Sequence, residues 1–159
     1  MYKILLLCIV SLFFISCGPK NNAFKYFEKD DMEIKGVQHT KKTDILNGNE
    51  VDVIFLATYL NKVDEEKFNL NEDAFLVSLY FSNKDSQDLF ENGYTFFLNN
   101  IAPISIEKIE KNNETFKSLM LKNSWGNYYL VKFKAQNSYN LALTLKNQNS
   151  NSAKLNFEK

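Results

Sequence analysis

Few side chains in this sequence have the type and spacing that catalysis by histidine or serine requires. His39 is the only histidine, so a Ser–His–Asp site would depend on it alone, and zinc sites with two or three histidines are excluded. It lies amid Gln38, Thr40, Lys41 and Lys42, a setting typical of a solvated strand or loop. No Gly-x-Ser-x-Gly motif occurs. We therefore predict no catalytic residue, no metal site and no cofactor.

Carboxylates are the second group that could do chemistry. Acidic clusters at 30–31, 64–66 and 85–88 could each offer oxygen ligands to calcium. None has the spacing of an EF-hand loop, because Gln87 is followed by Asp88 where that loop has glycine. Two carboxylates could also hydrolyse a glycoside, but no pair stands out among the 19 acidic residues. Solvated loops are the favoured interpretation, and an enzyme that uses acidic residues alone stays an open hypothesis.

A cysteine near the N-terminus has the most informative surroundings. Lys3 is the only charge in the first 19 residues, and an apolar stretch with one interruption covers residues 4–15. A helix needs about 20 apolar residues to cross a membrane, whereas this length and the small residue Ser16 are typical of a secretory signal. We predict that residues 1–16 are a signal peptide, cleaved between Ser16 and Cys17.

The residues at this point, Phe14-Ile15-Ser16-Cys17, resemble the lipobox that the lipoprotein signal peptidase of bacteria recognises. Phe14 replaces the usual leucine. The resemblance implies that Cys17 becomes the N-terminus, carries acyl chains and anchors the protein to a membrane. Gly18 follows where retention in the inner membrane of enteric bacteria usually calls for aspartate. The expected location is therefore the outer membrane, with the protein lipid-anchored and facing the periplasm or the cell surface.

The domain after the anchor must fold on its hydrophobic core alone. Cys8 would leave with the signal and Cys17 would be a thioether, so no thiol remains for a disulfide. Removing 16 residues from 159 leaves 143, enough for one domain. Residues 17–30 are predicted to be the lipidated cysteine and a short flexible tether, and residues 31–159 a single domain.

The charge pattern excludes some partners. The net charge is zero, and all 19 basic residues are lysine. Arginine supplies the planar fork that recognises phosphate and carboxylate, so its absence argues against specific nucleic-acid binding. It also argues against a peptidoglycan-binding domain of the OmpA type, which uses an aspartate and an arginine.

Apolar residues recur with period two along most of the chain, which predicts half-buried strands. Each of four stretches places its apolar side chains on one face: Phe75, Val77, Leu79 and Phe81; Tyr129, Val131, Phe133 and Ala135; Tyr139, Leu141, Leu143 and Leu145; and Ala153, Leu155 and Phe157. Asn47-Gly48-Asn49 predicts a tight hairpin turn. We expect about eight or nine short strands in an all-β sandwich or barrel, with one helix over Ser86 to Glu91.

The segment from Asn123 to Val131 resembles the Gly-x-Tyr start of the sixth strand in immunoglobulin-like domains, with Gly126 and Tyr128 in the two places. Ser124 replaces the usual aspartate, and the cysteine pair is missing. The resemblance implies an immunoglobulin-like antiparallel β-sandwich in which the Tyr128 hydroxyl bonds back to the preceding turn, a tyrosine corner. The whole chain is similar to small immunoglobulin-like lipoproteins of Campylobacter-like Gram-negative bacteria, a resemblance that implies a fold and a location but no chemistry.

Two of the predicted strands, within Val51 to Leu60 and Phe75 to Phe81, are apolar on both faces. Such strands are either covered twice or expose an adhesive surface. Loops or the N-terminal segment could cover the second face. Otherwise it is a surface for self-association or for a protein partner, built from Ile54, Leu56, Leu60, Leu76 and Tyr80.

Three functions follow as hypotheses. The favoured one is a membrane-anchored, non-enzymatic surface or periplasmic interaction module. The alternative is a carrier or chaperone for a lipid or another hydrophobic ligand at the outer membrane, which requires a pocket of several hundred cubic ångströms. The third, an enzyme that uses acidic residues alone, requires two carboxyls about 5–10 Å apart in a cleft.

Overall fold

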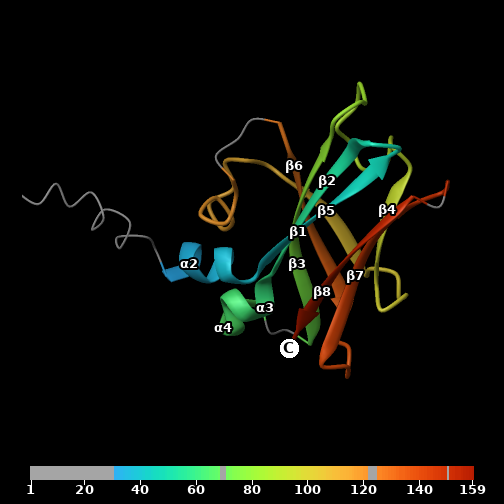
Figure 1. The fold of residues 1–159 in the computed structure, drawn as a ribbon. Helices are drawn as coiled ribbons and strands as arrows, with labels where there is room; N and C mark the ends of the chain where they lie inside the picture. Colours follow the sequence, from blue (N-terminus) through green and yellow to red (C-terminus); the bar gives the residue numbers. More distant parts are fainter. Residues whose placement is uncertain (1–30, 69–70, 122–124, 150) are drawn as a thin grey trace, which may run out of the picture.

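The structure, a computed structural model, describes residues 31–68, 71–121, 125–149 and 151–159 (Figure 1). The predicted signal peptide and tether, with Ser16 and Cys17, lie outside the described residues. Eight strands occur in the described part: β1 (Thr40–Asn47), β2 (Glu50–Tyr59), β3 (Glu72–Phe81), β4 (Tyr94–Leu98), β5 (Ser105–Ile109), β6 (Asn127–Lys134), β7 (Asn140–Asn147) and β8 (Ser152–Glu158). The helices there are α2 (Asp31–Gln38), α3 (Leu60–Val63) and α4 (Glu65–Phe68).

The strands form two antiparallel sheets. Sheet A has the order β1-β2-β3-β6-β5, and sheet B has the order β4-β7-β8. All neighbouring strands run antiparallel. Figure 1 shows the helices on the side of sheet A away from β4, β7 and β8. The prediction of an all-β sandwich with about eight strands is confirmed at this level.

The core lies between the sheets and consists of the side chains that the period-two pattern places on the inner faces. Phe75, Val77, Leu79 and Phe81 of β3 are all 0% exposed. The inner residues of β6, β7 and β8 are buried in the same cluster: Tyr129, Val131, Phe133, Leu141, Leu143, Leu145, Ala153, Leu155 and Phe157. Along β7 and β8 every second side chain is buried, as the pleat predicts, whereas most residues of β3 are buried on both faces.

The pattern overshoots the strand ends at two positions. Ala135 and Tyr139 were expected on inner faces, but both are exposed. β6 ends at Lys134 and β7 begins at Asn140, so both residues belong to the connection between the strands. Side chains in a connection no longer follow the pleat, which is why period two fails there.

The hairpin prediction is confirmed, and the helix prediction is wrong. Asn47 pairs with Glu50, and Gly48 between them has φ +61°, a value that glycine adopts without steric cost. The segment 86–91, expected to be helical, is irregular at residues 86–88 and forms a turn from Leu89 on. The Asp88 carboxylate accepts hydrogen bonds from the backbone N–H groups of Phe90 and Glu91 at 2.8 and 3.2 Å. This local side-chain bonding competes with helix formation.

The three helices of the described residues were not predicted. In α2, Ile34 and Val37 are 38% and 67% exposed, so the helix has no buried apolar stripe for a pattern to reveal. α3 and α4 have four residues each, too few to show a helical period. Leu60 was placed on a strand face, but it begins α3.

Candidate functional site

The residues predicted to form a second apolar face lie on the outer side of sheet A, with one exception. In the register of β2 and β3, Ile54 pairs with Tyr80, and Leu76 pairs with Thr58. Leu56 lies between them on β2 and pairs with Ser78. Paired residues in an antiparallel ladder point to the same face. The exception is Leu60, which begins α3 at the end of this face.

Burial divides this set into two parts. Leu60 and Leu76 are 0% and 2% exposed and belong to a second hydrophobic cluster, separate from the inner core. Ile54, Leu56 and Tyr80 are half-buried. One end of the outer face is thus covered like a core, whereas the other end is accessible to solvent.

Short elements outside the two sheets cover the buried end of this outer face. Phe116, 5% exposed, stacks on Phe68 of α4 with ring centroids 5.9 Å apart. The turn that carries Phe116 is fixed by Asn113, whose side-chain oxygen accepts a hydrogen bond from the Thr115 backbone N–H at 3.0 Å. Such side-chain bonds to the backbone stabilise turns without regular secondary structure. The segment 113–121 therefore forms an ordered wall over the sheet.

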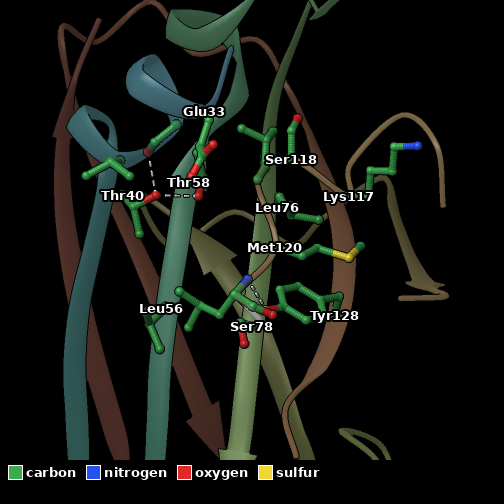
Figure 2. A pocket seen from close by; sticks show the side chains of 14 residues that line it. Glu33, Thr40, Leu56, Thr58, Leu76, Ser78, Lys117, Ser118, Met120 and Tyr128 are labelled. Atoms are coloured by element: carbon green, nitrogen blue, oxygen red, sulfur yellow. Dashed lines mark hydrogen bonds between the residues drawn. The ribbon is translucent and has the colours of Figure 1, made fainter. Parts of the chain in front are cut away.

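Between this wall, α2 and sheet A lies a pocket with a volume of about 560 Å³. Figure 2 shows Leu56, Leu76, Met120 and Tyr128 around it. The lining residues come from α2, four strands of sheet A and the wall: Glu33, Gly36, Val37, Thr40, Leu56, Thr58, Leu76, Ser78, Lys117, Ser118, Leu119, Met120, Leu121 and Tyr128. The predicted second-face residues Leu56 and Leu76 thus contribute to it, while Ile54, Leu60 and Tyr80 do not.

A glycine sets the distance between α2 and the wall. A Cβ atom at Gly36 would lie 2.5 Å from Cδ2 of Leu119, so no larger residue fits unless Leu119 moves. The Ser118 hydroxyl also contacts the Met32 sulfur at 3.5 Å. α2 and the wall therefore contact each other beside the pocket, and both contribute residues to its lining.

The hydroxyl groups of Thr40, Thr58 and Tyr128 bond to one another or to the backbone, and that of Ser118 contacts the Met32 sulfur. Oγ1 of Thr40 donates to the Gly36 carbonyl at 2.6 Å and lies 2.6 Å from Oγ1 of Thr58. The Tyr128 hydroxyl accepts a hydrogen bond from the Leu121 N–H at 2.7 Å. Burial raises the pKa of Tyr128 above its ordinary value. Because these polar atoms already have partners, the surface they leave to a ligand is mainly apolar.

Of the two residues proposed for a tyrosine corner, Tyr128 lines this pocket and Gly126 does not. Gly126 is buried directly before β6, and Tyr128 is the second residue of that strand. The Tyr128 hydroxyl bonds to a backbone group seven residues upstream, at Leu121. This bond ties the end of the wall to sheet A.

His39 lies apart from the pocket, at the junction of α2 and β1. Burial lowers its pKa, and the positive charges of Lys62 and Lys35 lower it further. Within the described ranges, no group of three or more acidic, histidine or cysteine side chains could hold a metal ion. Among the described residues, neither the lysines near His39 nor a cluster of metal-binding side chains forms a reactive centre there.

Asp73, a buried carboxylate outside the pocket, has hydrogen-bond partners on both of its oxygens. Asp73, 1% exposed, accepts hydrogen bonds from the Tyr59 hydroxyl at 2.8 Å and from the Gln136 N–H at 2.7 Å. The Lys159 ammonium lies 2.9 Å from it. This arrangement stabilises the negative charge and joins the C-terminal lysine to β3, so we interpret it as structural.

Sequence reasoning found the sheet side of the pocket but missed its other walls. Val37, Thr40, Thr58 and Ser78 were not singled out, and neither was the segment 117–121. The pairing of Ser78 with Leu56 and Tyr128 follows from strand register, which the sequence does not specify alone. The apolar run Leu119-Met120-Leu121 was the only signal for the wall.

Among the described residues, no helix has the length and apolar character that a membrane span requires. Comparison with known proteins finds no matching family model, no matching curated protein and no matching solved structure. The function must therefore be argued from the pocket itself.

Proposed function

We propose that this protein is a lipid-anchored bacterial envelope protein that acts as a non-enzymatic binding module. Its contact site is the pocket on the outer face of sheet A. The observation that carries this proposal is a concave, mainly apolar site of about 560 Å³, a volume within the usual range of ligand-binding sites. Its surroundings suit recognition, because Val37 and Leu121 at its edge are 67% and 50% exposed.

The chemistry of the pocket supports binding rather than catalysis. Its lining holds one carboxylate, Glu33, and one ammonium, Lys117. The Lys117 ammonium pairs with Glu114, and in Figure 2 its side chain extends away from Leu56. A pair of nearby carboxyls, which a glycosidase would need, is not among these lining residues.

The fold proposal is an immunoglobulin-like sandwich preceded by one added strand. The order β2-β3-β6-β5 corresponds to strands A, B, E and D of the constant-type immunoglobulin arrangement, and β4-β7-β8 corresponds to C, F and G. β1 would then extend the A edge. In this assignment Tyr128 lies in the strand equivalent to E, whereas a tyrosine corner belongs near the start of F. Tyr128 would therefore make a comparable bond at a different corner.

The carrier hypothesis has one specific observation in its favour. A packed sandwich offers no room for a ligand between its sheets, but the pocket lies outside the inner core and meets the size that a hydrophobic ligand requires. A carrier would use the same site, and it would differ from an interaction module in releasing its ligand to another acceptor.

The anchor is tested by changing Cys17 to alanine in the full chain. Because the acyl chains attach to the cysteine sulfur, we expect labelled palmitate to be absent from the variant and the unprocessed precursor to accumulate. For the unchanged protein, membrane fractionation should place it with outer-membrane markers. Palmitate in the Cys17→Ala protein, or recovery of the unchanged protein mainly with inner-membrane markers, would reject the anchor or its location.

The site is tested by a photo-crosslinking amino acid placed in the anchored protein in cells. At Val37, on the edge of the pocket, we expect adducts after irradiation, whatever the chemical class of the ligand. At Thr144, on the outer face of sheet B, the same amino acid serves as the matched control and should give few adducts. Equal yields at both positions would refute the pocket as the binding site.

A further inference from the structure

We propose that the occupant of this pocket is a single acyl chain of a membrane lipid. The inference rests on the proposed binding function and names its ligand class. It is carried by three observations: the bonding of the polar atoms in the pocket, the exposed apolar residues at its edge, and the position of the pocket next to the start of the described chain.

The first observation concerns what the pocket can recognise. The Thr40 and Thr58 hydroxyls bond to each other, and Thr40 also donates to the backbone. The Tyr128 hydroxyl is engaged by Leu121. A ligand that must form hydrogen bonds would have to break these contacts, and buried polar groups left without partners are costly. A hydrocarbon chain makes no such demand, and it gains from contact with Leu56, Leu76 and Met120.

The second observation concerns the edge of the pocket. Val37 on α2 and Leu121 on the wall both line the pocket while remaining largely exposed. Ile34, one helical turn before Val37, is also exposed. Exposed apolar side chains at the edge of an apolar pocket offer an entering hydrocarbon chain apolar surface to contact.

The third observation concerns distance from the membrane. α2 begins at Asp31 and forms one wall of the pocket. The predicted lipidated cysteine and tether, residues 17–30, number 14 and end directly before Asp31. A chain of this length spans at most about 50 Å. With Cys17 as the anchor, the start of α2 therefore stays within about 50 Å of the bilayer, where acyl chains are the most abundant apolar ligand.

The absence of a buried charge in the pocket lining determines the expected specificity. Glu33 and Lys117 are the only charged lining residues, and neither is buried. The lipid headgroup should thus remain in solvent and contribute little selectivity. Affinity should depend on chain length instead: each added methylene should strengthen binding by up to about fourfold until the pocket is filled, after which the gain should stop.

The test uses the full-length, anchored protein in cells whose phospholipids carry a photoactivatable acyl chain. After irradiation, we expect lipid adducts on peptides that contain Leu76 or Leu119. Ser78→Phe should fill the pocket floor and reduce the adducts at least tenfold. Thr144→Phe adds the same ring on the outer face of sheet B and should leave them unchanged. Val37→Glu, at an exposed position that cannot disturb the core, should reduce them as well.

Any of the following outcomes would overturn the inference. Adducts that persist in both Ser78→Phe and Val37→Glu would place the chain elsewhere. A crosslink from the pocket to the Cys17 peptide would make the protein's own anchor the occupant. If the Val37 crosslinker traps only a protein and lipid adducts are missing, the acyl-chain inference fails while the binding function stands. If neither probe reacts at the pocket, both proposals fail.

Addition of photoactivatable lysophospholipids of increasing chain length to isolated membranes gives an independent readout. We expect adduct yield at the pocket to rise with chain length and then reach a plateau, with little difference between anionic and zwitterionic headgroups. A yield governed by the headgroup and independent of chain length would contradict the inference.

Discussion

The two faces of sheet A are built from the same strands but are covered in different ways. The inner face packs on sheet B, and its side chains in β2 and β3 are almost entirely inaccessible; Phe55 and Phe75, for example, are 0% exposed. The outer face is covered by α2, α3, α4 and the segment 113–121. There Leu76 is buried but Leu56 is half-buried. Sheet B covers the inner face of β2 and β3 completely, whereas short elements cover the outer face only in part.

Aromatic contacts show the same difference. In the inner core, Phe75 contacts Phe133 and Phe157 with ring centroids 6.0 and 5.3 Å apart. On the outer face, Tyr80 meets Trp125 edge-on at 5.4 Å, but Trp125 is 56% exposed. Incomplete cover is what leaves room for the pocket. The inner face therefore provides stability, and the outer face provides the candidate binding site.

The largest effect is expected in the inner core. Phe133→Ala should lower the free energy of unfolding by about 3–5 kcal/mol, because it removes buried contacts and leaves a cavity. That is a large part of a typical total of about 5–15 kcal/mol. Chemical denaturation measures the change. Phe90→Ala, the same truncation at a residue that is 60% exposed, is the matched control and should shift stability by about 0.5 kcal/mol or less. Full stability in Phe133→Ala would contradict the packing of β6.

Two leucines on the outer face, one buried and one half-buried, test whether its two ends differ in stability. Leu76→Ala should cost about 2–3 kcal/mol, near the lower end of the range for a buried leucine. Leu56→Ala, in the half-buried part of the pocket, should cost about 1 kcal/mol or less and reduce crosslinking at Val37. Denaturation and crosslink yield are measured on both variants. If Leu56→Ala were the more destabilising change, the pocket would be part of the core rather than a site.

A smaller effect should follow from loss of the bond that ties the wall to the sheet. Tyr128→Phe removes the hydroxyl that accepts the Leu121 N–H, which should cost about 0.5–1.5 kcal/mol. Tyr139→Phe is the control. Tyr139 is 60% exposed, so removal of its hydroxyl should not change the free energy of unfolding measurably. Hydrogen exchange at Leu121 should become faster in Tyr128→Phe alone. Unchanged exchange would mean that other contacts hold the wall.

The smallest effect concerns pH at the junction of α2 and β1. The pKa of His39 is lowered in the folded protein, so the unfolded chain binds a proton more readily. Its contribution to stability is therefore complete above the ordinary histidine pKa of about 6.5 and decreases as pH falls below it. His39→Gln should reduce the difference between denaturation midpoints measured at about pH 7.5 and about pH 5.5. An unchanged difference would assign the acid sensitivity to carboxylates.

The inner half of the fold was predictable because its signal is local. Alternation placed the core residues correctly within β3, β6, β7 and β8, but it failed at Ala135 and Tyr139 just beyond the strand ends. Gly48 marked the first hairpin. The errors lie where local rules compete. Asp88 bonds to nearby N–H groups and prevents a helix, and the strand pattern continued one residue too far, into Leu60 of α3.

The candidate site was only partly predictable. The sequence identified two of its lining residues, Leu56 and Leu76, since both belong to strands that are apolar on each face. It could not identify Val37 or Ser118, which reach the pocket from segments far apart in the chain. The contact between Ser118 and Met32 joins residues 86 positions apart. Nothing local in either segment specifies that contact.

By itself, the sequence determined which side chains avoid water, because the period of a strand decides which of its residues share a face. It also predicted a lipid anchor at Cys17, which lies outside the described residues. Only the tertiary structure decided what covers each face. The wall of residues 113–121 meets α2 because Gly36 lets the two approach, and it meets α4 where Phe116 stacks on Phe68. These contacts exist only when distant segments have been brought together, so the pocket between them could not be read from the order of the residues.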